Sequence, residues 1–244
     1  MLYVDIFQQY CQEYDGQTPT NPRGAGTMIK ILRIDTSPRP EMDLTLKAGG
    51  SYSRALASSV VAHLNEALPG ASVLVRDLVV APVPHIANET IIGYYTDKDQ
   101  QTPMRKSALA QSDRLIAELR AADIVVLSVP IYNFSVPSSL KAWIDHIVRI
   151  SETFSYTDGN FQGLLYGKKA YLCCSYGAGG YMNGGPLAGY DSMAPYLTMI
   201  LNFIGIKDVT MFAVEATTGD AETIDKQITI ALDAMRDHFS AFHI

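Results

Sequence analysis

The stretch IVVLSVPIYNF, from Ile124 to Phe134, decides the fold of this 244-residue chain. Its apolar beginning predicts a strand that is buried on both faces of a parallel sheet. The strand leads directly into the loop Pro-Ile-Tyr-Asn-Phe, and open α/β sheets bind their ligands at the carboxyl ends of such strands. Tyr132 and Phe134 can offer ring faces there, and Asn133 can offer hydrogen bonds. We expect the loop to hold a flat ligand with polar edges, although a loop with two core aromatics fits the same residues.

Strands and helices alternate along most of the chain. Apolar runs predict the strands, and longer amphipathic stretches predict the helices. The predicted strands are 29–34, 72–78, 124–129, 169–174 and 209–214, and the predicted helices are 53–68, 102–122, 138–149, 193–203 and 222–242. An Asp-Gly pair predicts a hairpin or loop within residues 153–165. The alternation predicts an α/β fold with a five-stranded, doubly wound parallel sheet in the flavodoxin-like order 2-1-3-4-5.

The first 27 residues differ from the rest of the sequence. They are polar and have no sustained period, and the stretch from Pro19 to Gly26 is typical of a linker. We therefore expect an N-terminal extension, residues 1–27, that lies outside the core, followed by one domain over residues 28–244. A start codon assigned too far upstream would give the same pattern.

Composition bounds the partners of the protein. With 48% hydrophobic and 18% charged residues, we expect a soluble globular protein with enough apolar surface for a homodimer. The net charge of −6 argues against nucleic acid as a partner. The three cysteines, among them the adjacent Cys173 and Cys174, give neither a disulfide framework nor the spacing of metal ligands. No apolar run is of membrane-spanning length and no secretory signal is recognisable, so we expect a cytoplasmic protein without a membrane partner.

Three polar loops follow the first, third and fourth predicted strands and should meet in one crevice. The first loop supplies Ser37 and then Ser51, Tyr52 and Ser53 at a helix start, where hydroxyls and backbone amides can bind a phosphate monoester. The same serines also fit ordinary helix caps. The glycine patterns of triphosphate and dinucleotide sites are missing from this loop. Arg54 follows, and we expect it either to assist the phosphate or to lie in solvent.

The loop after the fourth predicted strand begins at Ser175 and is rich in glycine. Glycines let the backbone approach a planar ligand closely, although a glycine-rich surface turn has the same composition. Ser175 before Tyr176 weakly resembles the nucleophile elbow of acyl hydrolases, but Cys173 stands where the elbow has glycine. None of the five histidines marks an obvious general base. A receiver domain is disfavoured because the acidic cluster that it needs is reduced to Asp35.

Five motifs occur in a characteristic order. They are Pro130-Ile131-Tyr132-Asn133-Phe134, Leu140-Lys141, Thr153-Phe154-Ser155-Tyr156-Thr157, Gly167-Lys168-Lys169-Ala170 and Phe203-Ile204-Gly205-Ile206. In these motifs the chain resembles the FMN-dependent NADH:quinone oxidoreductases, also called azoreductases, from about residue 28 to the end. The resemblance implies a flavodoxin-like homodimer with one FMN per subunit near the interface.

The resemblance also implies a role for each loop. Ser37, Ser51, Tyr52 and Ser53 would hold the FMN phosphate; Ile131, Tyr132, Asn133 and Phe134 the isoalloxazine and ribityl region; and Ser175, Tyr176, Gly177 and Ala178 the polar edge of the flavin. Tyr156 and Phe203 match aromatic positions on the substrate side. NADH would pass a hydride to the flavin, and a quinone or azo compound would then accept two electrons in the same pocket. No metal and no catalytic side chain is implied.

Three features depart from the family pattern. Ile131 stands where methionine is common, Tyr176-Gly177-Ala178 replaces Arg-Gly-Gly, and the loop from Pro38 to Gly50 is longer than usual. We expect the lost arginine to change the redox potential of the flavin and the choice of acceptor. Two alternatives are a flavodoxin-type electron carrier without NADH turnover and, less favoured, an acyl hydrolase that uses Ser175.

Overall fold

The computed structural model describes residues 28–44 and 49–242. The predicted extension, residues 1–27, lies outside the described residues. Five parallel strands form one sheet in the order β2-β1-β3-β6-β7. They are β1 (Lys30–Asp35), β2 (Ser72–Asp77), β3 (Ile124–Pro130), β6 (Lys169–Ser175) and β7 (Asp208–Val214). With the two hairpin strands set aside, this is the order 2-1-3-4-5, so the predicted fold is confirmed.

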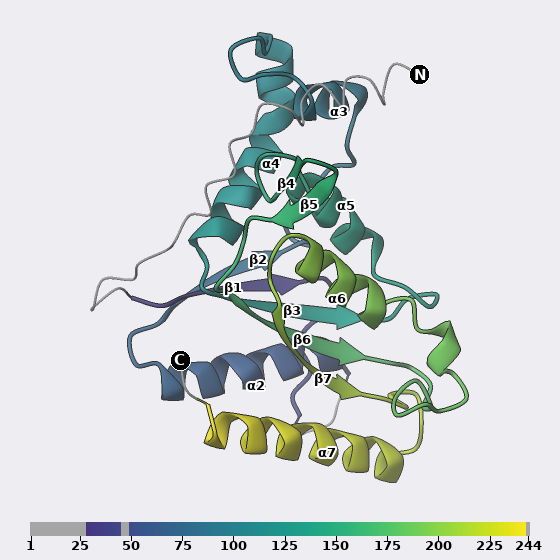
Figure 1. Cartoon of the computed structure of the whole chain (residues 1–244). Coiled ribbons are helices and arrows are strands. Elements are labelled where there is room, and N and C mark those ends of the chain that lie inside the picture. Colours follow the sequence, from purple (N-terminus) through teal and green to yellow (C-terminus); the bar gives the residue numbers. More distant parts are fainter. Residues whose placement is uncertain (1–27, 45–48, 243–244) are drawn as a thin grey trace.

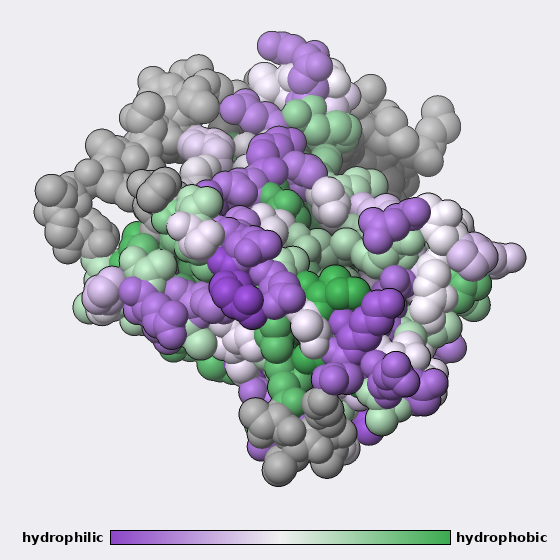
Figure 2. All heavy atoms as spheres, turned by 90° about the horizontal axis from the view of Figure 1, so that it is seen from below, coloured by the Kyte–Doolittle hydropathy of each residue, from purple (hydrophilic) through white to green (hydrophobic). Residues whose placement is uncertain are grey.

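Helices cover both faces of the sheet (Figure 1). On one face lie α2 (Tyr52–Ala67) and α7 (Ala221–Ser240), and on the other lie α4 (Pro103–Ala121), α5 (Ser138–Ile147) and α6 (Ala194–Phe203). Figure 2 looks onto the α2 and α7 side, where hydrophilic residues are spread over the surface with apolar residues between them. The two helix layers leave the loops at the strand ends as the place for a ligand.

The central strand β3 divides the core into two apolar clusters. Val125 and Leu127 pack with α4, α5 and α6, whereas Ile124 and Val126 pack with α2 and α7. Side chains alternate between the faces of a strand, so a strand covered on both sides must be apolar throughout. Every residue of β3 is buried. This is the physical reason why IVVLSVP is an apolar run.

A hairpin projects from the α5 and α6 side of the sheet (Figure 1). It consists of β4 (Phe154–Thr157) and β5 (Asn160–Gly163). Asp158 and Gly159 both have positive φ, 53° and 79°, as a two-residue hairpin turn requires. The predicted hairpin is thus confirmed. The short helix α3 (Asn88–Tyr94) was not predicted. Among the described helices, none has the length and apolar composition needed to cross a membrane.

Candidate functional site

The loops after β1, β3 and β6 lie side by side at the carboxyl edge of the sheet. β1 pairs with β3, and β3 pairs with β6, in parallel register. Two hydrogen bonds continue this pairing into the loops. The Thr36 hydroxyl donates to the Ser128 carbonyl oxygen at 2.7 Å, and the Ile131 N–H donates to the Ser175 carbonyl oxygen at 2.9 Å. The three loops that the sequence singled out therefore form one continuous crevice edge.

After β3 the chain makes a tight turn, which we call the ring-bearing turn (Tyr132–Ser135). Tyr132 and Ser135 exchange two backbone hydrogen bonds of 2.9 and 3.0 Å. Asn133 and Phe134 both have positive φ, 47° and 68°. This conformation is unusual for a bulky residue such as phenylalanine, and it costs about 1–3 kcal/mol. The side chains of Tyr132, Asn133 and Phe134 are exposed, so the turn presents two rings at the crevice.

A second segment packs against the ring-bearing turn. The ring of Tyr190 lies 5.6 Å from the ring of Phe134, centroid to centroid, and the Ser192 N–H donates to the Phe134 carbonyl oxygen at 2.9 Å. This segment, Tyr190 to Ser192, was not predicted from the sequence to belong to the site. Its one signal is the run of small residues with Pro186 before α6, which is typical of a loop with a fixed path.

A pocket of about 780 Å³ opens between the ring-bearing turn, α5 and α6. Apolar surface comes from Val136, Pro137 and Ala142, together with the ring of Tyr196. Polar groups come from His85, Ser192 and the ion pair of Lys141 with Asp145. The volume lies within the range of pockets that bind flat organic ligands, and such pockets combine apolar walls with a few polar groups.

The predicted phosphate residues gather at the start of α2. Ser51 caps the helix, because its hydroxyl oxygen accepts from the Arg54 N–H at 3.3 Å. The Ser53 hydroxyl oxygen lies 3.1 Å from that of Ser51 and 3.2 Å from that of Ser128. Ser37 is also buried, and its carbonyl oxygen accepts from the guanidinium of Arg54 in the first turn of α2. The first turn of α2 has no acidic residue that would repel an anion. Hydroxyl groups at such a helix N-terminus can donate hydrogen bonds to a phosphate monoester.

Arg54 does not lie in solvent, so that expectation from the sequence is wrong. Its guanidinium donates to the Asp77 carboxylate at 2.7 Å, to that of Asp35 at 3.2 Å, and to the Ser37 carbonyl oxygen at 2.6 Å. Although burial favours the neutral acid, the bonds from Arg54 and from backbone amides lower the pKa of Asp77. Arg54 is thus a structural cation that holds the first loop onto the sheet.

The side chain of Tyr176 points into the core. It is fully buried, its hydroxyl donates to an Asp191 carboxylate oxygen at 2.9 Å, and burial raises the pKa of the phenol. Only the backbone of this residue is left for a ligand. The backbone of the loop is fixed from behind, since Thr218 N–H donates to the Gly177 carbonyl and Ala216 N–H to the Ala178 carbonyl, both at 3.1 Å.

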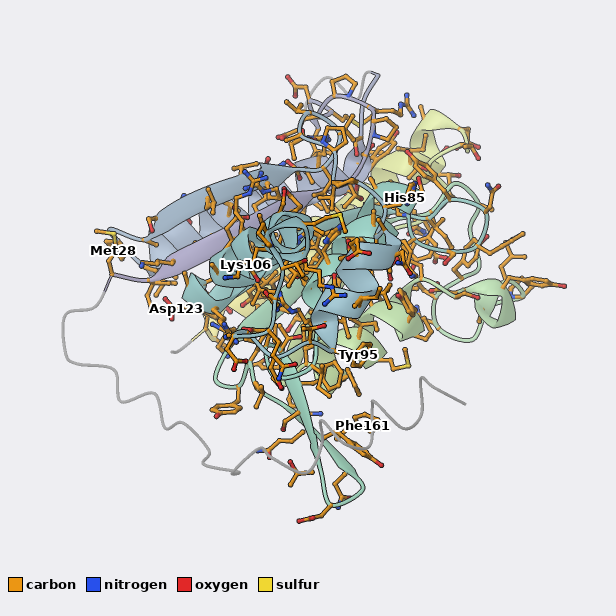
Figure 3. All side chains as sticks on the ribbon, turned by 90° about the horizontal axis from the view of Figure 1, so that it is seen from above. Met28, His85, Tyr95, Lys106, Asp123 and Phe161 are labelled. Carbon is orange, nitrogen blue, oxygen red and sulfur yellow. The ribbon has the colours of Figure 1, made fainter. Side chains whose placement is uncertain are left out.

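Tyr156 and Phe203 lie together in an aromatic cluster, which consists of Phe154, Tyr156, Phe161 and Phe203 and links the hairpin to the end of α6. Tyr156 and Phe203 lie 4.6 and 5.4 Å from the Phe161 ring, centroid to centroid. None of these rings lines the pocket beside the ring-bearing turn. Figure 3 shows Phe161 on the projecting hairpin, well apart from His85, which belongs to that pocket. The cluster is therefore not part of the pocket of its own chain.

The described histidines mostly serve packing. His146 is hydrogen-bonded through Nε2 to the Pro84 carbonyl oxygen at 2.9 Å, and His238 through Nε2 to the Tyr171 hydroxyl at 3.2 Å. His63 stacks on Phe239. Each of the three is thus engaged in packing or in a hydrogen bond within the fold. Within residues 28–44 and 49–242, no group of three His, Cys, Asp or Glu side chains could hold a metal ion.

Comparison with known proteins agrees with this geometry. A sequence model described as the flavodoxin-like fold matches residues 29–239. A protein named FMN-dependent NADH:quinone oxidoreductase, from Xanthobacter autotrophicus, is 47% identical over 182 residues, which are 75% of this chain and 84% of that protein. This chain belongs to the FMN-dependent NADH:quinone oxidoreductase family. The resemblance inferred from the five motifs is confirmed.

Solved structures of similar proteins share the fold of this family member. The azoreductase from Bacillus anthracis str. Sterne superposes with a TM-score of 0.77 and 25% identity over 88% of this chain and 100% of that chain. An FMN-dependent NADH-azoreductase from Bacillus anthracis str. Ames Ancestor, solved in complex with FMN, superposes with a TM-score of 0.72 and 22% identity over 87% of this chain and 98% of that chain.

The site of this oxidoreductase family member fits a flavin mononucleotide. The serine hydroxyls at the start of α2 suit a phosphate, the exposed rings of Tyr132 and Phe134 suit a flat ring system, and the fixed backbone after Ser175 suits its polar edge. The three features stand on the neighbouring strands β1, β3 and β6. A single elongated ligand can therefore touch all of them.

Proposed function

We propose that this protein is an FMN-dependent NADH:quinone oxidoreductase that also cleaves aromatic azo compounds to amines. The observation that carries the proposal is the ring-bearing turn, whose exposed rings stand between the serines of α2 and the backbone loop after β6. The names of similar proteins support it. The relative from Xanthobacter autotrophicus is named FMN-dependent NADH:quinone oxidoreductase, and the solved structure from Bacillus anthracis str. Sterne is an azoreductase.

The residues act by binding and orienting. Ser37, Ser51, Tyr52 and Ser53 hold the phosphate, with the backbone amides at the start of α2 contributing to the same anion. Ile131, Tyr132, Asn133 and Phe134 orient the ring system, and Ser175, Tyr176, Gly177 and Ala178 contact its polar edge, Tyr176 through its backbone alone. Bound FMN supplies the redox chemistry, which is hydride acceptance from NADH and transfer of two electrons to the acceptor.

The pocket beside the ring-bearing turn receives donor and acceptor in turn. Its volume of 780 Å³ and its apolar lining suit one flat ring system at a time. Exchange of NAD for a quinone or azo compound in one pocket makes the kinetics ping-pong. No side chain of the pocket has to transfer a proton, because water can supply it.

Tyr156 and Phe203 serve the substrate through a homodimer in this proposal. The aromatic cluster lies away from the pocket of its own chain, and Phe161 in the cluster is 55% exposed. A second copy can bring its cluster over the pocket of the first. The homodimer, the domain over residues 28–244 and the cytoplasmic location stay predictions from the sequence.

The test is the visible absorption spectrum of the purified protein with FMN, before and after anaerobic addition of NADH. Flavin bands that bleach, and return when a quinone is added, support the oxidoreductase. Bands that persist with NADH favour the electron carrier. A colourless protein that takes up no added FMN overturns the proposal.

A further inference from the structure

A chain of contacts joins the buried Tyr176 to the exposed Phe134. The Tyr176 hydroxyl donates to one oxygen of the Asp191 carboxylate at 2.9 Å. The other oxygen accepts from the backbone N–H groups of Met193 at 2.8 Å and Ala194 at 3.1 Å. Asp191 is therefore held both by the loop after β6 and by the start of α6.

The two chain neighbours of Asp191 both contact Phe134. Tyr190 packs its ring on the Phe134 ring, and Ser192 donates its N–H to the Phe134 carbonyl oxygen. A rotation of Asp191 would move both contacts, because the three residues are consecutive. The position of the Phe134 and Tyr190 rings thus depends on the anchor of Asp191.

These two rings form an exposed apolar wall. Phe134 is 51% exposed and Tyr190 is 59% exposed. The two rings do not line the pocket themselves, but their chain neighbours Asn133 and Ser192 do, so the wall borders the pocket. Phe134 has a positive φ, which is an unfavourable backbone conformation for phenylalanine. The two hydrogen bonds between Tyr132 and Ser135 must hold it in that conformation. Contacts from outside the turn, those of Tyr190 and Ser192, are what can keep the ring in one place.

We propose that Tyr176 is a positioning residue that acts through Asp191 to set the wall of Phe134 and Tyr190, and that this wall selects acceptors with two fused aromatic rings over acceptors with one. The inference rests on the proposed quinone reductase function. The second ring of a two-ring acceptor stacks on the wall, whereas a single ring reaches only the flavin.

The test compares kcat/KM for a naphthoquinone and a benzoquinone at saturating FMN. Tyr176→Phe removes the hydroxyl and keeps the ring, which packs 4.9 Å from that of Tyr181. We expect the preference for the naphthoquinone to fall about fivefold, the worth of one aromatic stacking contact. Tyr190→Leu should give the same fall, and because Tyr190 is exposed this variant keeps the proposal testable if Tyr176→Phe does not fold.

Tyr171→Phe is the matched control, since Tyr171 is equally buried and its hydroxyl is bonded to His238 in the other apolar cluster. It should lower Tm and leave the acceptor preference unchanged. The double variant of Tyr176→Phe and Tyr190→Leu should show no further fall, because both act through one wall. A preference that stays within about twofold of the wild type in a folded Tyr176→Phe variant or in Tyr190→Leu overturns the inference, and so does an additive fall in the double variant. Wild-type protein that turns over neither quinone overturns the proposed function instead.

Discussion

At the scale of the residue, Phe134 shows a conflict between folding and function. Glycine would adopt its φ of 68° without strain. For Phe134→Gly we expect the free energy of unfolding of the apoprotein to stay within about 1 kcal/mol or to rise. The Kd for FMN should increase about tenfold, because a ring contact is lost. Urea unfolding and an FMN fluorescence titration measure the two quantities. A loss of stability with an unchanged Kd would mean that the ring serves folding.

The same scale separates what the sequence could predict from what it could not. The exposed rings of Tyr132 and Phe134 were predictable, because the buried strand and the loop that carries the rings are consecutive in the sequence. The positions and partners of the Arg54 and Tyr176 side chains were not predictable. Each is decided by a carboxylate on another element, Asp77 for the first and Asp191 for the second. A pairing across the fold leaves no local pattern in a single sequence.

At the scale of the element, two glycines let the hairpin touch the end of α6. A Cβ on Gly163 would lie 2.2 Å from the Gly205 backbone nitrogen. Gly163→Ala must therefore push β5 away from α6 and separate the rings of Phe161 and Phe203. We expect a loss of more than about 2 kcal/mol, or a Tm lower by about 4–8 °C, by calorimetry. Gly189→Ala, with nothing within 4 Å of its Cβ, should leave Tm unchanged and is the control.

Elements with a strong pattern were predicted closely. The strand expected over 124–129 is β3, Ile124–Pro130, and the Asp-Gly pair located the hairpin turn. The missed helix α3 has seven residues, and its N-cap residue Ala87 makes no side-chain cap bond. A helix this short has no apolar period, and its stability comes from packing on α4 rather than from its own sequence.

At the scale of the whole molecule, buried titratable groups predict two steps in acid unfolding. The first belongs to histidine. Burial lowers the pKa of His146 and of His238. The unfolded chain then binds protons first, so the free energy of unfolding should begin to fall below the ordinary histidine pKa of about 6.5. His146→Gln keeps a donor for the Pro84 carbonyl and does not titrate. It should weaken this step in urea unfolding measured from pH 8 to 5.

The second step belongs to carboxylates. Burial opposes ionisation of Glu152, but the charges of Arg120 and Lys98 outweigh it and lower the pKa of Glu152, as Arg54 does for Asp77. A carboxylate with a lowered pKa stabilises the fold above its unfolded pKa of about 4, and that stability is lost as pH falls through the folded value. Urea midpoints should therefore drop again between about pH 4 and 2. Glu152→Gln should be less stable than wild type at pH 7 and lose less on acidification. A variant that loses as much as wild type below pH 4 would show that other carboxylates control this step.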